Sequence, residues 1–298
     1  MEIVCQNVSK VFKIKDGLFK TKKLTVVKDF NYCIKQGEII ALMGLASSGK
    51  STIVNLLSGR ALPTSGRVLI NGEENFAELK SVCEVISSFE NKNIMFNDSV
   101  YNNLAVLGSK KGINSFDVEK RIVELRDSLE LGKIINKKLC ELDSFDLIKV
   151  NVGISMISSP QVLFFDNALL GLDAITKNML LKILKRVNKE FKTTIVIASV
   201  DLSDIEKICK RVSIVNDGKI VADGEYDCLK EKYWKYKCLS IVFNKSFNVP
   251  KGEFVVLEHS DYFLKIKIDF SECNFASLLN QLDVNSILDI NISSILEI

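Results

Sequence analysis

Residues 44–52 have the types and spacing of a loop that binds nucleotide phosphates. They read Gly-Leu-Ala-Ser-Ser-Gly-Lys-Ser-Thr and fit the pattern G-x-x-x-x-G-K-[ST]. Backbone N–H groups of such a loop surround the phosphate oxygens, while Lys50 would reach the β- and γ-phosphates and the Ser51 hydroxyl would bind Mg²⁺. The alternative is a turn rich in glycine and serine that fits the pattern by chance. The predicted nucleotide contacts are Gly44, Ala46, Ser47, Ser48, Gly49, Lys50, Ser51 and Thr52.

The segments on either side of this loop predict the elements that position it. Residues 38–43 form a short apolar run typical of a strand, and residues 51–57 have helical spacing. A strand that enters a glycine-rich turn followed by a helix directs free N–H groups and the positive helix end at the phosphates. Apolar runs at 162–165 and 193–198 are typical of buried parallel strands, and a helical stretch (177–191) precedes the second. This alternation predicts an α/β sheet with the phosphate site at the carboxyl ends of its strands.

Composition limits the class of protein. The 298 residues are 47% hydrophobic and 26% charged, which is typical of a folded protein with one large and one small domain. No apolar stretch approaches the ~20 residues of a membrane-spanning helix. The first residues lack the basic flank and apolar core of a secretory signal, so we expect a cytoplasmic protein. A net charge of +3 predicts no nucleic-acid partner, and eight cysteines without a C-x-x-C pair favour reduced thiols over a zinc site or disulfides.

A group of lysines precedes the phosphate loop. We favour a solvated hairpin tip for this segment, with contact to an anionic membrane surface as the alternative. The lysines are Lys10, Lys13, Lys15, Lys20, Lys22, Lys23 and Lys28.

Several further segments extend the pattern of the loop and point to one family. The chain resembles the nucleotide-binding subunit of ABC transporters, especially single-cassette exporter subunits with a short C-terminal extension. The resemblance covers about residues 1–225. Besides the loop, the segments that carry it are 8–12, 63–72, 159–166, 171–173 and 212–224.

The resemblance implies the fold and the domains. It implies an α/β P-loop NTPase fold, the ABC cassette, with a mixed sheet, helices and an inserted α-helical lobe at about residues 91–158; the cassette is expected over residues 1–232. A small α+β module is expected over residues 239–298, with a dimerisation or regulatory role and a passive structural cap as equal alternatives. Its strand-like patterns are at 239–243, 254–258, 262–268 and 286–292, and its helical spacing is at 274–282.

The resemblance also implies roles for single residues. Phe12 would stack on the adenine of ATP, and Asp166 would organise Mg²⁺ together with Ser51. Residues 171–173 would touch a partner cassette, and the helical lobe would receive the coupling helices of the transmembrane permease subunits.

Departures from the family pattern affect the residues that would hydrolyse ATP. Asn167 stands where the family has the glutamate that activates water, and an amide cannot accept a proton at neutral pH. Val200 stands at the position of the histidine that contacts the γ-phosphate. The one histidine of the chain, His259, is predicted to be an ordinary surface residue of the extension. Glu90 replaces the lid glutamine; its carboxylate still suits Mg²⁺ but adds negative charge near the phosphates.

The family's LSGGQ signature aligns with residues 142–146, which read Leu-Asp-Ser-Phe-Asp. Both glycines are absent, Asp143 replaces the serine, and Asp146 adds a second carboxylate. Acidic residues stabilise the start of a helix, but we expect them to repel the γ-phosphate of ATP bound to a partner. A gap of one residue would restore Ser144 to the serine position, but not the glycines.

These patterns lead to three functional hypotheses. The first is an ATP-binding subunit of an ABC exporter, peripheral on the inner face of the cell membrane, which binds Mg·ATP and pairs with another cassette while its own site hydrolyses poorly. The second is a nucleotide-sensing regulatory module that drives no transport. The third is a weakly active homodimeric ATPase. A difficulty for the first is that the altered signature would also weaken the partner's composite site. The cargo is not encoded in this chain.

Overall fold

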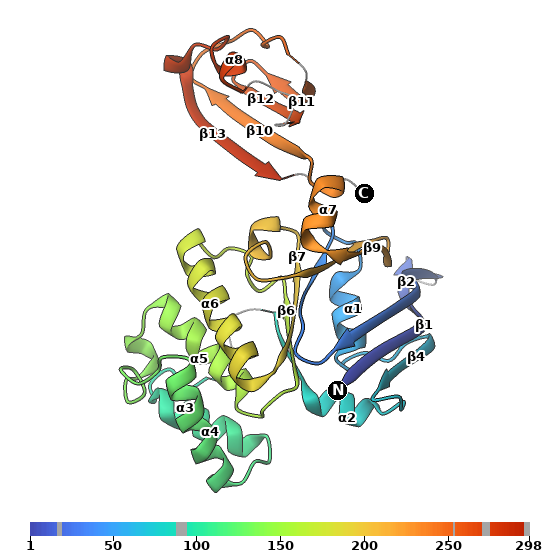
Figure 1. Ribbon diagram of the computed structural model, residues 1–298, viewed down its shortest axis with the longest axis vertical. Helices are drawn as coiled ribbons and strands as arrows, with labels where there is room; N and C mark the ends of the chain where they lie inside the picture. Colours follow the sequence, from blue (N-terminus) through green and yellow to red (C-terminus); the bar gives the residue numbers. More distant parts are fainter. Residues whose placement is uncertain (17–19, 88–93, 253, 270–274, 295–298) are drawn as a thin grey trace. The chain divides into compact units, whose positions relative to one another are not determined.

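Two compact units, residues 1–223 and 224–298, make up the chain (Figure 1). The computed structural model describes residues 1–16, 20–87, 94–252, 254–269 and 275–294.

A six-stranded sheet forms the centre of the first unit, in the order β5-β6-β7-β3-β8-β9. Neighbouring strands from β5 to β8 are parallel, and β3 lies between β7 and β8. Residues Val162 to Phe165 of β6 and all of β7 are buried, as the continuous apolar runs predict. The strands are β3 (Ile39–Met43), β5 (Cys83–Ile86), β6 (Val162–Asp166), β7 (Thr194–Ser199), β8 (Arg211–Asn216) and β9 (Lys219–Glu225).

A second, antiparallel sheet has the order β2-β1-β4 and faces helix α1 (Lys50–Leu57). The core between the two sheets contains Phe30 from β2, Ile53 and Leu56 from α1, and Phe164 from β6, each at most 1% exposed. Its strands are β1 (Glu2–Asp16), β2 (Lys20–Lys35) and β4 (Ser65–Ile70). Helix α1 is therefore held on both sides, and its first turn faces the carboxyl edge of the larger sheet.

The predicted helical lobe follows β5. It contains α3 (Val100–Lys110), α4 (Ser115–Ser128), the short η1 (Leu139–Glu141) and α5 (Ser144–Met156); α2 (Phe76–Val82) precedes β5. The side chains of Ser99, Asn114 and Asp143 accept backbone N–H groups at the starts of α3, α4 and α5.

Helix α6 (Ala174–Phe191) packs against β7, and Figure 1 shows it on the opposite side of β6 and β7 from α1. It begins three residues before the predicted start at Lys177. The reason is a cap that the pattern of apolar residues did not reveal. Asp173 Oδ1 accepts the N–H groups of Ile175 and Thr176 at 2.9 and 3.0 Å, which fixes the helix start at Ala174. A short η2 (Leu202–Asp204) follows β7.

The second unit contains a four-stranded antiparallel sheet in the order β11-β12-β10-β13. The side chains of Ile241, Leu264 and Leu278 form part of its core. The helical pattern predicted over 274–282 extends too far, because Gln281 and Leu282 bond to carbonyls three residues back and so form turns. His259 is exposed on β11. The elements are α7 (Tyr226–Tyr233), β10 (Tyr236–Phe243), β11 (Phe254–Ser260), β12 (Phe263–Asp269), α8 (Phe275–Leu279), η3 (Val284–Ser286) and β13 (Ile287–Ser294).

A polar network joins the two sheets of the first unit. Arg211 on β8 forms two bonds to the Asp223 carboxylate, at 3.0 and 2.8 Å, and donates to the Cys33 carbonyl of β2 at 3.0 Å. Ser213 donates to Asp223 at 2.7 Å and lies 2.6 Å from the Tyr32 hydroxyl. Burial alone would raise the pKa of Asp223, but the hydrogen bonds from Arg211 and Ser213 outweigh it and lower this pKa.

The substitution Asp223→Asn is expected to lower the free energy of unfolding by about 2 kcal/mol at neutral pH, because it removes the charge that pairs with Arg211. A lowered carboxyl pKa contributes stability that is present at neutral pH and lost as the pH falls below about 4. The difference between variant and wild type should therefore shrink in acid. Urea unfolding at several pH values measures it, with the exposed Glu74→Gln as a control that should follow the wild type. If the difference in unfolding free energy between Asp223→Asn and the wild type grew in acid, the pKa of Asp223 would not be lowered in the folded protein.

Candidate functional site

The loop between β3 and α1 fits its surroundings only with glycine at two positions. Gly49 has a φ of +102°, and a Cβ there would lie 3.1 Å from the Val26 carbonyl oxygen. A Cβ on Gly44 would lie 2.3 Å from the Val215 carbonyl oxygen. On the other side, the N–H of Gly218 donates to the Ser48 carbonyl at 2.8 Å. Strand β2 and the turn between β8 and β9 therefore form the walls of the loop.

The start of α1 is free to bind an anion. Gly49 is its N-cap and provides no side-chain acceptor for the N–H groups of the first turn. These N–H groups and the positive helix end favour a phosphate group. The predicted contacts Ala46, Ser47, Ser48 and Thr52 lie in this loop and first turn, and Ser47 has a positive φ of 65°.

Lys50 is held inside the loop. Its Nζ donates to the carbonyls of Gly44 and Leu45, both at 2.8 Å, and to Ser48 Oγ at 3.3 Å, and only 4% of the residue is exposed. Burial lowers the pKa of Lys50, and attraction to Asp166 opposes this effect. Its partners inside the loop are neutral oxygens, so a phosphate would give this ammonium group a charged partner.

Ser51 and Asp166 come together as predicted for a magnesium site. The Ser51 hydroxyl donates to Asp166 Oδ1 at 2.9 Å, and the Asn167 amide lies 3.4 Å from the same oxygen. A hydroxyl and a carboxylate are oxygen ligands of the kind that Mg²⁺ prefers. In the described part of the chain, no group of three His, Cys, Asp or Glu side chains is placed to hold a metal. Glu90 lies outside the described residues.

Asn167 and Val200 lie at the same edge of the sheet. The N–H of Asn167 donates to the Ala198 carbonyl at 3.0 Å, and its φ of 54° is one that asparagine tolerates well. Val200 follows Ser199, the last residue of β7. Ser199 pairs in register with Met43, which lies at the entrance of the loop. Its side chain is 44% exposed. Neither side chain can accept a proton at neutral pH, so this edge offers no general base at these two positions.

Phe12 presents an accessible ring on β1. It is 40% exposed, pairs in register with Leu24 of β2, and has Lys10 Nζ at 5.3 Å from its ring centroid. Strand β2 also carries Val26, whose carbonyl oxygen leaves little room for a side chain at Gly49 of the loop. The β1–β2 hairpin thus connects the ring to the phosphate loop, and stacking on adenine remains a prediction.

The acidic start of α5 is less negative than its sequence suggests. Asp143 is the N-cap and accepts the N–H of Asp146 at 2.8 Å. The Asp146 carboxylate forms an ion pair with Lys149 at 2.5 Å, and Lys149 is buried. We expected both carboxylates to repel a phosphate. The ion pair with Lys149 compensates the charge of Asp146, and repulsion of a partner's phosphate by the start of α5 remains a prediction.

Replacing Asp143 with alanine is expected to destabilise the first unit by about 1 kcal/mol, because the N–H of Asp146 loses its acceptor. Asp143→Asn keeps an acceptor and should cost much less. Chemical unfolding of the two variants beside the wild type measures the cap. If the alanine and asparagine variants lose equal amounts of unfolding free energy, Asp143 stabilises the helix through its charge and not through capping.

A charged cluster behind Val200 escaped the sequence analysis. Lys177 Nζ lies 2.7 Å from Asp204 Oδ1 and 3.3 Å from Asp201 Oδ2, and Asp204 is 2% exposed. Ser199 donates to the other oxygen of Asp204. The cluster fixes the turn that carries Val200 to the first turns of α6. The sequence signal for it is weak, because Lys177 and the segment 199–204 lie more than twenty residues apart in the chain.

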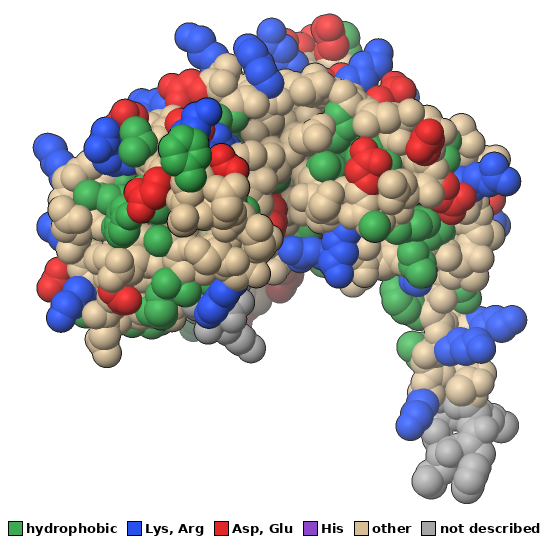
Figure 2. All heavy atoms as spheres, turned by 90° about the horizontal axis from the view of Figure 1, so that it is seen from below, with side chains coloured by type: hydrophobic (Ala, Val, Ile, Leu, Met, Phe, Trp, Pro, Cys, Tyr) green, Lys and Arg blue, Asp and Glu red, His purple; other side chains and the backbone are tan. Residues whose placement is uncertain are grey.

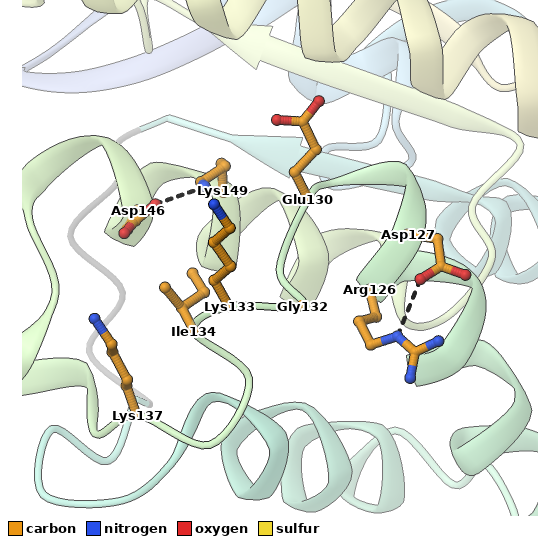
Figure 3. A pocket seen from close by; sticks show the side chains of 9 residues that line it. All are labelled: Arg126, Asp127, Glu130, Gly132, Lys133, Ile134, Lys137, Asp146 and Lys149. Carbon is orange, nitrogen blue, oxygen red and sulfur yellow. Dashed lines mark hydrogen bonds and ion pairs between the residues drawn. The ribbon is translucent and has the colours of Figure 1, made fainter.

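A cavity of about 730 Å³ lies in the helical lobe beside the start of α5. Figure 3 shows Lys133, Lys149 and Asp146 along one part of it and the pair Arg126–Asp127 at the other. Charges of both signs line the cavity, which favours a polar or charged partner segment. The lining residues are Arg126, Asp127, Glu130, Gly132, Lys133, Ile134, Lys137, Asp146 and Lys149.

Among the helices of the described residues, none combines the length and apolar character needed to cross a membrane.

Comparison with known proteins gives one family model and many relatives. The model of the family described as ABC transporter matches residues 27–170. The methionine import ATP-binding protein MetN 2 of Bacillus licheniformis is 30% identical over 226 residues, or 74% of this chain and 64% of that protein. MetN of Francisella tularensis is 32% identical over 205 residues, or 67% of this chain and 59% of that protein. The chain spans about three fifths of the length of these curated relatives.

Solved structures share the fold. One is cbiO1 from Clostridium perfringens, part of the ABC transporter complex cbiONQ, with a TM-score of 0.66 and 22% identity over 77% of this chain and 91% of that one. Another is the ATP-binding cassette MJ0796 as a dimer bound to ADP and Pi, with a TM-score of 0.60 and 23% identity over 75% of this chain and 98% of that one. These likenesses confirm the fold class predicted from the sequence.

Proposed function

We propose that this chain is an ABC transporter ATP-binding cassette, the subunit of a transporter that binds Mg·ATP, pairs with a second cassette and hydrolyses ATP slowly in its own site. The observation that carries the proposal is the phosphate loop. It joins an uncapped helix start, a buried Lys50 and the Ser51–Asp166 pair at one edge of the sheet.

Each part of this site would have a definite task. The N–H groups at the start of α1 and the Lys50 ammonium would hold the phosphates. Ser51 and Asp166 would hold Mg²⁺, which supplies positive charge at the phosphate oxygens when bound. The exposed ring of Phe12 would stack on the adenine.

Slow hydrolysis is inferred from the same edge. A positioned general base typically contributes about 10²–10⁴-fold to the rate, and the Asn167 amide cannot take that role. Val200 offers neither a hydrogen bond nor charge to a γ-phosphate. Asp143 at the start of α5 adds a negative charge on the surface that the family pattern turns toward ATP on a partner. We therefore propose that the chain retains ATP binding and turns ATP over only weakly.

The contact with a permease is proposed for the helical lobe. Its cavity beside α5 presents lysines and carboxylates to an entering segment. Lys133 and Lys137 are exposed there, so an entering segment with acidic side chains would find positive partners. A location on the inner face of the membrane would follow from this contact.

The direction of transport has two candidates. Export is the expectation from the short module that follows the cassette, and import is favoured by the relatives, whose names describe methionine import. The two are separated by reconstitution with the permease in vesicles that have the cassette outside. Added ATP would move cargo into the lumen for an exporter and out of it for an importer.

Co-purification from solubilised membranes of the host tests the whole proposal. A tagged chain should bring down a membrane protein with several spanning helices and a second cassette, and binding of fluorescent ATP should be measured on the same preparation. ATP binding without any membrane partner would instead support the regulatory module. A wild-type chain that binds no ATP at micromolar concentration would overturn both.

A further inference from the structure

The far end of the β1–β2 hairpin extends beyond the rest of the three-stranded sheet. Pairing of β1 with β4 ends at the Ser9–Ser65 pair, and from Val11 onward β1 pairs only with β2. We define residues 11–16 and 20–25 as the basic arm. Figure 2 shows this end of the hairpin as a narrow projection with several blue side chains at the lower right. A two-stranded ribbon of this kind is at best marginally stable alone in water.

Lysines of the basic arm lie close to one another on the two strands. Lys13 and Lys23 form a directly opposed pair in the register, and Lys15 lies on the same face two residues from Lys13. Lys22 lies on the other face. All four are exposed, and within the described residues none of them lies within ion-pair distance of a carboxylate. Like charges in directly opposed positions destabilise a ribbon, so an anionic partner would relieve a repulsion that the arm carries on its own.

The other face of the basic arm is mainly apolar. Phe12 pairs with Leu24, and Ile14 pairs with Lys22, so these side chains share one face of the ribbon. Ile14 is 42% exposed and Leu24 is 45% exposed. The arm is therefore amphipathic, with an apolar face backed by a face of lysines and threonines.

We infer that the basic arm binds the surface of an anionic lipid bilayer. Exposed aliphatic side chains can enter the boundary between headgroups and acyl chains, while lysines on the opposite face meet the lipid phosphates. A nucleic acid would attract the lysines equally well, but its backbone offers no apolar surface to Ile14 and Leu24. The apolar face therefore decides in favour of lipid. This contact goes beyond the proposed function, because it needs neither bound nucleotide nor a permease.

The test is sedimentation of the purified full chain with vesicles in the absence of nucleotide. One set of vesicles is phosphatidylcholine mixed with phosphatidylglycerol, and the other is phosphatidylcholine alone. The wild type should bind the anionic vesicles, and the quadruple variant Lys13→Gln, Lys15→Gln, Lys22→Gln, Lys23→Gln should bind at least about tenfold more weakly. Raising the salt from about 0.1 M to about 1 M should release the wild type. The pair Ile14→Ser, Leu24→Ser should also weaken binding.

A matched variant removes the same number of charges elsewhere. Lys182, Lys185, Lys189 and Lys219 are exposed on α6 and β9, and their replacement by glutamine should leave vesicle binding unchanged. Fluorescent-ATP binding should be the same for the wild type and for the two lysine variants that fold. Loss of vesicle binding with ATP binding retained is therefore distinguishable from failure of the proposed function. Equal sedimentation of wild type and quadruple variant would overturn the inference. Binding to an RNA or DNA duplex that needs the lysines but not Ile14 and Leu24, without binding to vesicles, would overturn it in favour of a nucleic acid.

Discussion

Replacing Lys50 with alanine is expected to weaken ATP binding by at least about 100-fold. Hydrogen bonds to a charged group contribute about 1.5–3 kcal/mol each, and Lys50 would make more than one to the phosphates. The wild-type side chain is already buried inside the loop, so little ordering of it is needed when ATP arrives. Titration with fluorescent ATP in the presence of Mg²⁺ measures the change.

Two further variants keep this prediction testable. Lys182→Ala removes an exposed lysine from α6 and should bind ATP like the wild type. Ser51→Ala leaves the lysine in place and should weaken binding mainly when Mg²⁺ is present, because Ser51 and Asp166 are the proposed ligands. Far-ultraviolet circular dichroism and a melting curve identify a variant that fails to fold. Unchanged affinity of a folded Lys50→Ala protein would show that the loop does not bind phosphate.

Restoring the missing groups with Asn167→Glu and Val200→His is expected to raise steady-state ATP hydrolysis by about 10²-fold or more. The glutamate supplies a base beside Asp166, and the histidine supplies a donor at the end of β7. At position 167 the φ of 54° strains the backbone of glutamate by about 1 kcal/mol more than that of asparagine. This cost in stability is small beside the expected gain in the rate of hydrolysis.

The matched control for this pair is Asn167→Gln with Val200→His. Glutamine has the length of glutamate and the same backbone cost but cannot accept the proton, so this protein should stay near the wild-type rate. Phosphate release per mole of protein is the readout. Ordinary turnover by the wild type that disappears in Asn167→Ala would show that the amide suffices and that hydrolysis is not impaired.

The sequence is informative where the determinants of a feature are local. The phosphate loop, the strand before it and the helix after it depend on residues 38–57, and all three are present in the structure. The pair Asp146–Lys149 is also local, and its spacing of three residues on a helix was a signal that the charges compensate. The start of α6 depends on the side chain of Asp173 rather than on periodicity, and for that reason the predicted start was late.

Other features depend on tertiary packing and have no local signal. The Lys177–Asp204 pair joins α6 to the turn after β7, and the Arg211 network joins β8 to β2 and β9. Exposure of the lysines and aliphatic side chains on the basic arm also follows from where β4 stops pairing, which the sequence does not mark. Stacking of Phe12 on adenine and binding of Mg²⁺ remain predictions, and Glu90 lies outside the described residues.

The order of strands in the larger sheet has a consequence for how the protein is made. Strand β3 ends at Met43, whereas the strands on either side of it begin at Thr194 and Arg211. At about 5–20 residues per second, a ribosome needs on the order of ten seconds to make the intervening chain. During that time the apolar strand β3 can pair with neither β7 nor β8. It stays exposed on the nascent chain, where it can bind chaperones or aggregate. The turn at Gly218, which bonds to Ser48 and forms one wall of the phosphate loop, is also made late, so the loop lacks this wall until that turn has left the ribosome.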